Sequence, residues 1–258
     1  MKNIIVFGNV PLATWVVKRI LNSKNLNLLG IVCDKYDKDF FKNHGMQEKS
    51  LYSYSKKNKL NILEFDEAYE MALKEKILGI SVRYHKLFKE SYFKVFQPGI
   101  INLHGGELPR YRGANIANYI VLEQNTQAGG TLHFIDKGID EGDIVEREIL
   151  NLGTSETAYS VFQKTLFALQ IAFDRFLNHI DCQEDKEVKS NTQNFYIEKG
   201  EKARTYFKKG IENYRIVEYN KALEWNELDL KARAFYFPGH KGAILKKGER
   251  MIELKYLE

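Results

Sequence analysis

Two polar side chains with useful chemistry stand close together in an apolar stretch near the middle of the chain. Gly99-Ile-Ile-Asn-Leu-His104 has the composition of a buried strand and carries Asn102 and His104 two positions apart. Because alternate residues of a strand point to the same side, we expect both side chains to face one place. The Gly- and Pro-containing run Gly105–Gly113 predicts a loop directly afterwards. The pair is therefore predicted at the end of a strand, where open α/β sheets bind their ligands.

A second apolar strand that leads into an acidic loop lies downstream, with the sequence Gly129-Gly-Thr-Leu-His-Phe-Ile-Asp-Lys-Gly-Ile-Asp-Glu-Gly-Asp-Ile144. Three short motifs occur in an order and with a spacing that resemble those of the folate-dependent formyltransferases. They are Asn-Leu-His, then Leu-Pro-Arg-Tyr-Arg-Gly, then Gly-Ile-Asp-Glu-Gly-Asp. The resemblance extends over residues 1–180. It implies a catalytic trio formed by the Asn and His of Asn-x-His and the first Asp of Asp-x-Gly-Asp, which are Asn102, His104 and Asp140.

The resemblance implies transfer of a formyl group from 10-formyltetrahydrofolate to an amine, and the three residue types suit that reaction. Attack by a neutral amine creates an oxyanion and leaves a proton to be removed from nitrogen. Asn102 can donate an N–H to the oxyanion, a role worth roughly 3–4 kcal/mol in hydrolases. His104 can take the proton and return it to the leaving folate nitrogen. Asp140 can orient the imidazole and stabilise its protonated form, or hold a water that relays the proton, and no step requires a metal.

Further positions are candidates for binding the folate. In the resembled family, the stretch that corresponds to Arg83–Phe88 lines the pterin pocket. Taken alone, His85 is more typical of a surface residue or a helix start than of a catalytic group. From the resemblance we expect the folate to contact His85, Lys86, Leu87, Phe88, Ile135 and Asp136.

The acceptor substrate is expected at the first helix and beside the motif loop. The helix that starts after Gly8 offers free N–H groups that can hold a phosphate, although a plain strand-to-helix turn remains an alternative. Glu107 departs from the family pattern and bears on how the amine fits beside His104. His133, on an apolar strand, is expected to be a hydrogen-bonded core residue. The acceptor-binding candidates are Asn9, Pro11, Gly105 and Gly106.

The composition excludes several classes of protein. The 258 residues are 44% hydrophobic, enough for one large α/β domain with an appendage or for two modest domains. The net charge of +5 is spread along the chain, and from Asp181 onward 16 Lys and Arg stand against 14 Asp and Glu, unlike a nucleic-acid-binding tail. Cys33 and Cys182 are expected to be reduced thiols. No apolar run suits a signal peptide or a membrane span, so we expect a cytoplasmic protein that binds neither membrane nor nucleic acid.

The order of the predicted elements indicates a doubly wound, Rossmann-like α/β fold. Ile4–Phe7 and Leu28–Cys33 have the apolar composition of buried parallel strands, and the segment between them has helical spacing. This βαβ opening favours a doubly wound sheet. Gly8–Ala13 lacks the second and third Gly of the dinucleotide motif, which disfavours a nicotinamide-dependent oxidoreductase. Thr154–Ile180 predicts one long amphipathic helix.

The last part of the chain predicts a small, mostly β module of residues 181–258 beside a catalytic domain of residues 1–180. It ends in a predicted hairpin, Ala243–Leu254, with Lys247-Gly248 at the turn. The segment Arg233-Ala-Phe-Tyr-Phe-Pro-Gly-His240 resembles the C-terminal extension of the family branch that formylates nucleotide-linked amino sugars. That resemblance implies a dTDP-linked amino-dideoxy sugar as acceptor, formylated for a surface polysaccharide such as O-antigen. The module is expected to shape the substrate site, to form a homodimer interface, or both.

Three other functions remain open at this point. A methionyl-tRNA formyltransferase would carry a longer RNA-binding domain than this short, nearly neutral tail. A glycinamide ribonucleotide formyltransferase would stop soon after the long helix, whereas this chain continues. A non-catalytic module that senses folate or a nucleotide sugar belongs to another class of protein, and the three filled catalytic positions argue against it.

Overall fold

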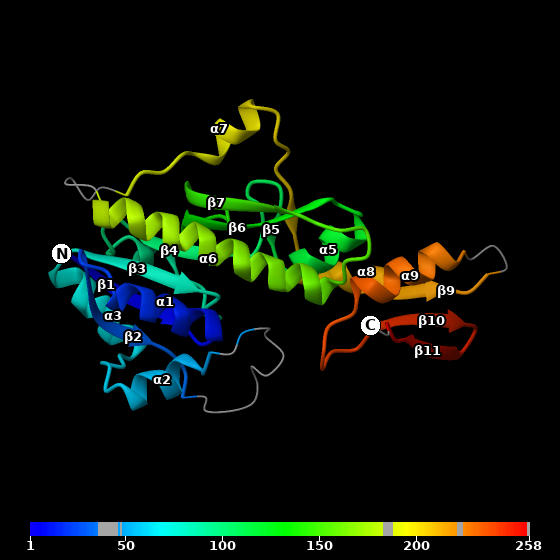
Figure 1. Ribbon diagram of the computed structural model, residues 1–258, viewed down its shortest axis with the longest axis horizontal. Helices are drawn as coiled ribbons and strands as arrows, with labels where there is room; N and C mark the ends of the chain where they lie inside the picture. The colour runs from blue at the N-terminus through cyan, green and yellow to red at the C-terminus, as the bar shows by residue number, and fades with distance from the viewer. Residues whose placement is uncertain (36–45, 47, 183–187, 221–223, 257–258) are drawn as a thin grey trace.

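A mixed sheet of six strands forms the centre of the protein, in the order β2-β1-β3-β4-β6-β7 (Figure 1). The computed structural model describes residues 1–35, 46, 48–182, 188–220 and 224–256. The first four strands in this order are parallel, while β6 is antiparallel to β4 and β7 is antiparallel to β6. The strands are β1 (Lys2–Gly8), β2 (Leu26–Val32), β3 (Ile77–Val82), β4 (Ile100–His104), β6 (Gln127–Phe134) and β7 (Ile144–Asn151).

The strand order reverses at β1, and this reversal creates the position where open sheets bind ligands. The chain continues from β1 to β2 on one side and then returns to β3 on the other side. Gly8 at the end of β1 pairs with Val82 at the end of β3, and Val82 in turn pairs with Leu103 of β4. The carboxyl ends of these three strands therefore meet at a topological switch point.

Alternate strand residues are buried in two separate cores, one on each face of the sheet. Helices α1 (Pro11–Leu21) and α6 (Ala158–Cys182) pack on the face that carries Val6, Ile101 and Leu103. Helices α3 (Phe65–Lys74) and α4 (Glu90–Phe93) pack on the opposite face, with Phe7 and Ile100. Figure 1 shows α6 extending along the sheet. The predicted doubly wound α/β fold is confirmed.

The segment after α6 forms a second, smaller sheet of three strands at the far end of the molecule from β2 (Figure 1). In it, β10 is parallel to β9 and antiparallel to β11, which gives the expected hairpin and the expected small C-terminal sheet. Before this sheet, β8 pairs with β5, a strand within the loop that follows β4. The division of the chain at residue 180 stays a prediction. The remaining elements are α2 (Leu51–Lys57), β5 (Arg112–Gly113), α5 (Ile116–Leu122), α7 (Gln193–Glu198), β8 (Thr205–Tyr206), a 3-10 turn (Lys208–Ile211), α8 (Glu212–Arg215), β9 (Ile216–Glu218), α9 (Trp225–Ala234), β10 (Ala243–Lys247) and β11 (Arg250–Leu254).

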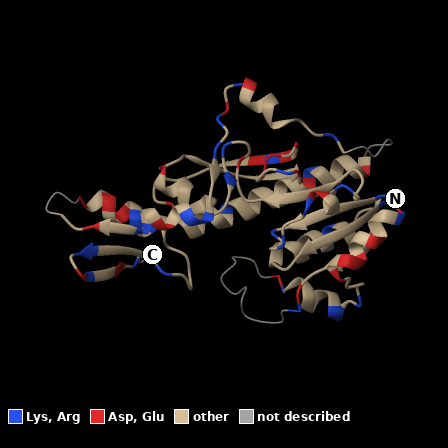
Figure 2. Ribbon diagram, turned by 180° about the vertical axis from the view of Figure 1, so that it is seen from behind, with Lys and Arg blue, Asp and Glu red and all other residues tan. Residues whose placement is uncertain are grey.

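Within the part of the chain that the structure describes, no helix has the length and apolar character needed to cross a membrane. Lys and Arg are interspersed with Asp and Glu, both around the six-stranded sheet and around the small C-terminal sheet (Figure 2).

Candidate active site

Asn102 and His104 lie on one face of β4, at its carboxyl end, as their spacing predicts. They share the face of Ile100, which is opposite to the face covered by α6. Asp140 lies in the loop between β6 and β7, and its Oδ2 is 3.4 Å from Nδ1 of His104. The end of β6 lies beside Ile101, so the loop after β6 must return along β4 to bring Asp140 to Asn102 and His104.

The His104 imidazole is held by the backbone of the motif loop. Its Nε2 lies 2.6 Å from the carbonyl oxygen of Tyr111. Because a carbonyl can only accept, Nε2 carries the proton, and Nδ1 of the neutral ring keeps its lone pair. Burial lowers the pKa of His104, although the Asp140 carboxylate opposes this effect. His104 is thus a neutral ring whose free nitrogen faces Asp140, while the Tyr111 carbonyl holds the opposite nitrogen.

Asp140 remains an ionised carboxylate between two imidazoles. Its oxygens lie 3.4 Å from Nδ1 of His104 and 3.4 Å from Nε2 of His133. The backbone N–H of Gly113 donates to Oδ2 at 2.8 Å. Burial alone would raise the pKa of Asp140, but attraction to the two imidazoles in their charged form, together with this N–H, outweighs burial and holds the pKa well below its usual range. The carboxylate is placed to stabilise His104 once the imidazole has taken a proton.

His133 belongs to the site as well, through contacts that the sequence analysis missed. It is 2% exposed and hydrogen-bonded, as expected of a core histidine. Its Nδ1 lies 2.9 Å from the carbonyl of Phe134 and donates to it, so Nε2 accepts from the Asn102 amide at 3.2 Å. This hydrogen bond fixes the Asn102 side chain and leaves its second N–H for a ligand. No signal in the residue order could have found this contact, because it depends on the pairing of β4 with β6, which puts His133 directly opposite Asn102.

The residues expected to contact folate are exposed or half-buried. Phe88 packs edge-on against Phe7, with ring centroids 5.1 Å apart. Lys86 extends over the ring of Phe65, with Nζ 5.3 Å from the centroid. Leu87 is 92% exposed. An apolar side chain this exposed, beside an aromatic cluster, is available to cover a bound planar ring.

Ile135 and Asp136 begin the loop that leads to Asp140. The Ile135 N–H donates to the carbonyl of Ile100 at 2.8 Å, which ties the start of the loop to β4. The Asp136 carboxylate accepts from the N–H of Gly138 at 3.0 Å. In this structure both residues shape the loop, and their contact with folate stays a prediction.

His85 lies beside Asn9, one of the acceptor-binding candidates. Its Nδ1 is 3.3 Å from Oδ2 of Asp34 and 3.4 Å from Nδ2 of Asn9. The Asn9 side chain donates to the Asp34 carboxylate at 2.7 Å and accepts from the Asp34 N–H at 2.7 Å. A carboxylate at this position disfavours a phosphate held by the Asn9 side chain itself. Pro11 is the first residue of α1 and is buried.

Gly105 and Gly106 serve close packing around His104. A Cβ on Gly106 would lie 2.6 Å from Nε2 of His104 and 2.5 Å from the carbonyl oxygen of Tyr111. A side chain there would therefore displace the hydrogen bond that orients the imidazole. A Cβ on Gly105 would lie 3.2 Å from the Thr165 hydroxyl of α6. The structure gives both glycines a packing role, and their contact with the acceptor stays a prediction.

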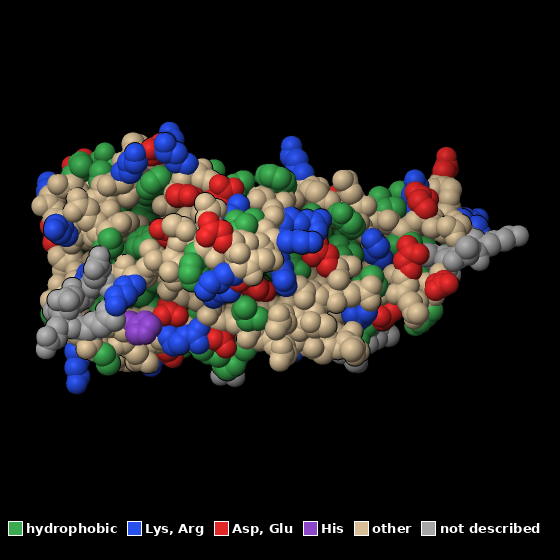
Figure 3. Space-filling view, turned by 90° about the horizontal axis from the view of Figure 1, so that it is seen from above, with side chains coloured by type: hydrophobic (Ala, Val, Ile, Leu, Met, Phe, Trp, Pro, Cys, Tyr) green, Lys and Arg blue, Asp and Glu red, His purple; other side chains and the backbone are tan. Residues whose placement is uncertain are grey.

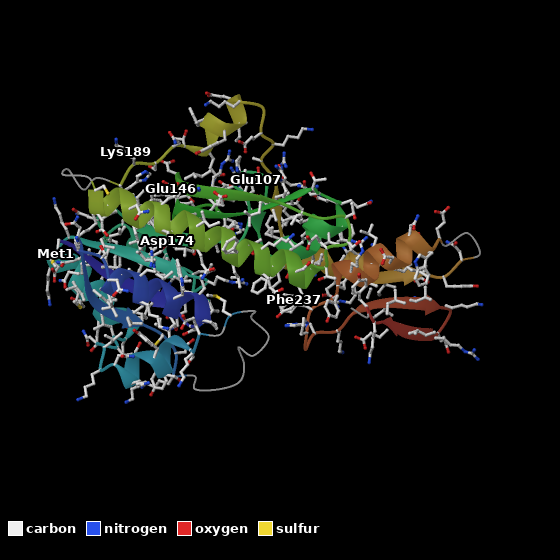
Figure 4. The ribbon with its side chains drawn as sticks, in the orientation of Figure 1. Met1, Glu107, Glu146, Asp174, Lys189 and Phe237 are labelled. Atoms are coloured by element: carbon white, nitrogen blue, oxygen red, sulfur yellow. The ribbon has the colours of Figure 1, made fainter. Side chains whose placement is uncertain are left out.

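Glu107 is an acidic residue of the motif loop that is buried against β6. Glu107 is 4% exposed. Its Cβ would lie 3.3 Å from a Cβ added to Gly129 of β6. Its Oε2 is 3.8 Å from Nη1 of Arg110 and has no hydrogen-bond partner among the described residues. Burial raises the pKa of Glu107. Figure 4 shows the residue near β6 and β7, beneath the segment that carries α7.

The arrangement as a whole combines a hydrogen-bond donor, a neutral base and a carboxylate at the switch point of a doubly wound sheet. Such a set suits transfer of an acyl-type group through an oxyanion. Within the described ranges, no three His, Cys, Asp or Glu side chains are arranged to hold a metal ion. The fold and site therefore define an α/β group-transfer protein.

Residues 2–176 match the formyl transferase family model, which is more than half of the chain. The protein belongs to the formyl transferase family. It is 25% identical over 169 residues to a GDP-perosamine N-formyltransferase of Brucella melitensis, a match that covers 65% of this chain and 60% of that protein. It is 24% identical over 195 residues to a methionyl-tRNA formyltransferase of Fusobacterium nucleatum, covering 73% and 61%. The chain thus spans less than two thirds of the length of these relatives.

Solved structures with the same fold include two N-formyltransferases. The enzyme from Helicobacter canadensis, in complex with folinic acid and dTDP-3-aminofucose, superposes with a TM-score of 0.72 at 22% identity, covering 96% of this chain and 85% of that one. A 4-N formyltransferase from Francisella tularensis gives a TM-score of 0.72 at 19% identity, covering 99% and 97%. At these identities the likeness establishes the fold, and it extends beyond the region of the family model into the C-terminal sheet.

Proposed function

We propose that this protein transfers the formyl group of 10-formyltetrahydrofolate to the amine of a nucleotide-linked amino sugar. The observation that carries the proposal is the arrangement of Asn102, His104 and Asp140 at the switch point of a formyl transferase family fold. The alignment of the whole chain with sugar N-formyltransferases supports the class of acceptor.

The geometry supports one order of events. The neutral amine nitrogen attacks the formyl carbon, and the N–H of Asn102 that is not bound to His133 donates to the oxygen that becomes negative. Nδ1 of His104 takes a proton from the attacking nitrogen, and Asp140 stabilises the imidazolium. The bond from the formyl carbon to N10 of the folate then breaks, and N10 receives the proton from His104. The products are the formamide and tetrahydrofolate.

The finer assignment is a dTDP-linked amino-dideoxy sugar that is formylated in the cytoplasm for a surface polysaccharide such as O-antigen. A dTDP-linked amino sugar is bound by the Helicobacter protein, which supports this nucleotide. Next to α6, Phe237 of the C-terminal module packs edge-on against Tyr159 and Phe162, with centroid distances of 5.1 and 5.2 Å (Figure 4). Both parts of the chain thus contribute to one aromatic cluster, which is consistent with a module that shapes the acceptor site.

We also infer that the protein is a homodimer that associates through the edge of the small sheet. Met251 and Ile252 of the edge strand β11 are 60% and 63% exposed. Edge strands with exposed apolar side chains pair readily with another chain. Analytical ultracentrifugation at micromolar concentration is expected to give a dimer for the wild type and a monomer for Ile252→Lys. Leu73→Lys, at an exposed position on the outer side of α3, is the matched control. A monomeric wild type would refute the inference.

Methionyl-tRNA is the main alternative acceptor, because relatives with that activity match the same region. Binding of tRNA requires a continuous basic surface. On the face seen in Figure 3, Lys and Arg are interspersed with Asp and Glu. The mixed charge of this face favours a small acceptor, either the nucleotide sugar or, with less support from the C-terminal sheet, glycinamide ribonucleotide.

The deciding experiment offers 10-formyltetrahydrofolate together with a panel of acceptors and follows release of tetrahydrofolate. The panel contains dTDP-, GDP- and UDP-linked 3-amino and 4-amino dideoxy sugars, methionyl-tRNA and glycinamide ribonucleotide. Turnover of a nucleotide sugar is the expected result, and the panel then names the base and the ring position. Turnover of either other acceptor alone would refute the sugar assignment. No turnover, with folate still bound, would favour a binding module.

A further inference from the structure

The loop that carries Asp140 has a conformation that its own sequence does not favour. Asp140 has φ 53°, in the left-handed region that L residues seldom adopt. The neighbouring Ile139 side chain is 49% exposed, so it contributes little hydrophobic packing to hold the loop in place. Strained backbone of this kind persists only where surrounding groups fix it. The groups that fix it therefore decide where the catalytic carboxylate lies.

Gln193, at the start of α7, is the side chain that binds the backbone of this loop. Its Nε2 donates to the carbonyl of Asp140 at 2.7 Å and to the carbonyl of Gly142 at 3.0 Å. Its Oε1 accepts from Nε of Arg112 at 2.9 Å. The side chain is 4% exposed, so these hydrogen bonds are shielded from water. Of the acidic and amide side chains, only an amide can donate twice and accept once at this position.

Two further contacts draw the same segments together. Arg112 extends beyond Gln193 and pairs with Glu141 of the loop at 3.1 Å. Asn191 and Ile144 exchange two backbone hydrogen bonds of 2.8 Å, which join the residues just before α7 to the start of β7. The loop after β4, the loop after β6 and the C-terminal segment thus meet around one carboxamide.

We propose that Gln193 is a positioning residue for formyl transfer, which acts by fixing the backbone of Asp140 so that its carboxylate faces His104. The inference rests on the proposed function for its kinetic readout. The proposal gives a positioning role in catalysis to a residue outside the stretch 2–176 that matches the family model. The C-terminal segment is then part of the catalytic apparatus as well as a substrate-shaping or dimer-forming module.

The expected kinetic effect follows from geometry. A shift of about 1 Å at a catalytic group can reduce the rate about 100-fold while ground-state binding changes little. We expect Gln193→Leu to lower kcat by about 10- to 100-fold with KM for both substrates within about threefold. Gln193→Glu keeps the acceptor for Arg112 but loses the two donors, and its charge repels both carbonyls. Its activity relative to wild type should recover as pH falls, because a protonated Glu regains one donor.

The decisive test is a double-mutant cycle with Asp140→Asn. If Gln193 acts through Asp140, Gln193→Leu causes no further loss of kcat in the Asp140→Asn protein. Equal losses in both backgrounds would overturn the proposal. Gln127→Leu is the matched control. The Gln127 amide also donates to a distant segment, to Asn151 of β7 at 3.4 Å, but it lies outside the site. This control is expected to retain wild-type kcat.

Hydrogen exchange followed by mass spectrometry provides a readout that needs no acceptor. Gln193→Leu is expected to speed amide exchange in residues 135–143 and to leave β1 and β3 unchanged. Unchanged exchange in the loop would overturn the proposal, and so would loss of protection throughout the protein, since that means general unfolding. If the wild type formylates nothing on the panel, the proposed function fails, while this measurement still decides the role of Gln193.

Discussion

Nδ1 of His104 lies 3.4 Å from the Asp140 carboxylate, with no proton of its own to share in the neutral ring. The opposite nitrogen is committed to the Tyr111 carbonyl at 2.6 Å. The base and the carboxylate are therefore arranged for the moment after proton transfer, when Nδ1–H can donate to Asp140. The Asp140 carboxylate therefore stabilises the protonated imidazole that forms in the transition state, and not the neutral imidazole of the resting enzyme.

Loss of the base should be the most damaging single change. His104→Ala is expected to reduce kcat about 10²- to 10⁴-fold, the usual range for a general acid–base group. Steady-state release of tetrahydrofolate measures this effect. His179→Ala is the control, because His179 is an exposed histidine that pairs with Glu146 at 3.0 Å, away from the site. Unchanged turnover in His104→Ala would rule out the mechanism.

The tautomer and titration of His104 can be observed directly. Nitrogen NMR of the imidazole is expected to show the Nε2–H tautomer and a midpoint below the ordinary histidine value near 6.5, because burial lowers the pKa of His104. The ring should therefore stay neutral as pH falls through 6.5 and take up a proton only at lower pH. A midpoint above 6.5, or an Nδ1–H tautomer, would contradict this geometry.

Removing the charge of Asp140 should affect both catalysis and titration. The carboxylate raises the pKa of His104 against the effect of burial, so Asp140→Asn is expected to move the His104 midpoint to still lower pH. The same change removes the partner of the imidazolium, and kcat should fall about 10²- to 10⁴-fold. If the midpoint rose instead, Asp140 would not be acting as the ionised neighbour of His104.

Asn102 is expected to act on the transition state. Asn102→Ala should lower kcat about 10²- to 10³-fold, as for loss of an oxyanion-hole donor, with KM nearly constant. His133→Phe, which removes the hydrogen bond at 3.2 Å that orients the amide, is expected to cause a smaller loss in kcat. A larger effect of His133→Phe than of Asn102→Ala would mean that His133 acts on the substrate directly.

The two glycines after His104 provide a matched pair of variants. In Gly106→Ala the new methyl would contact Nε2 of His104 at 2.6 Å and a backbone carbonyl at 2.5 Å, so the imidazole must move. We expect kcat to fall about 10- to 100-fold. In Gly105→Ala the nearest atom is the Thr165 hydroxyl at 3.2 Å, and a shift of a few tenths of an ångström relieves this contact without moving the imidazole. Equal effects of the two substitutions on kcat would refute this packing role.

The sequence by itself was sufficient for the fold class and for placing Asn102 and His104 on one face of a strand. Runs such as Ile4–Phe7 are apolar on every residue, which is the pattern of a strand covered on both faces, and the structure confirms that burial. The spacing of Asn102 and His104 determines their common face because the side-chain period of a strand is two. These are local properties of the chain, and local properties can be inferred from residue order.

Contacts between distant segments were decided only by the tertiary structure. The pairing of β4 with β6 places His133 against Asn102, and packing of the motif loop selects the Nε2–H tautomer of His104 through Tyr111. The burial of Glu107 was likewise set by its packing near Gly129. Gln193 reaches the Asp140 loop from 53 residues away. Residue order specifies which groups can donate or accept, whereas the register and packing of the folded chain determine which of them meet.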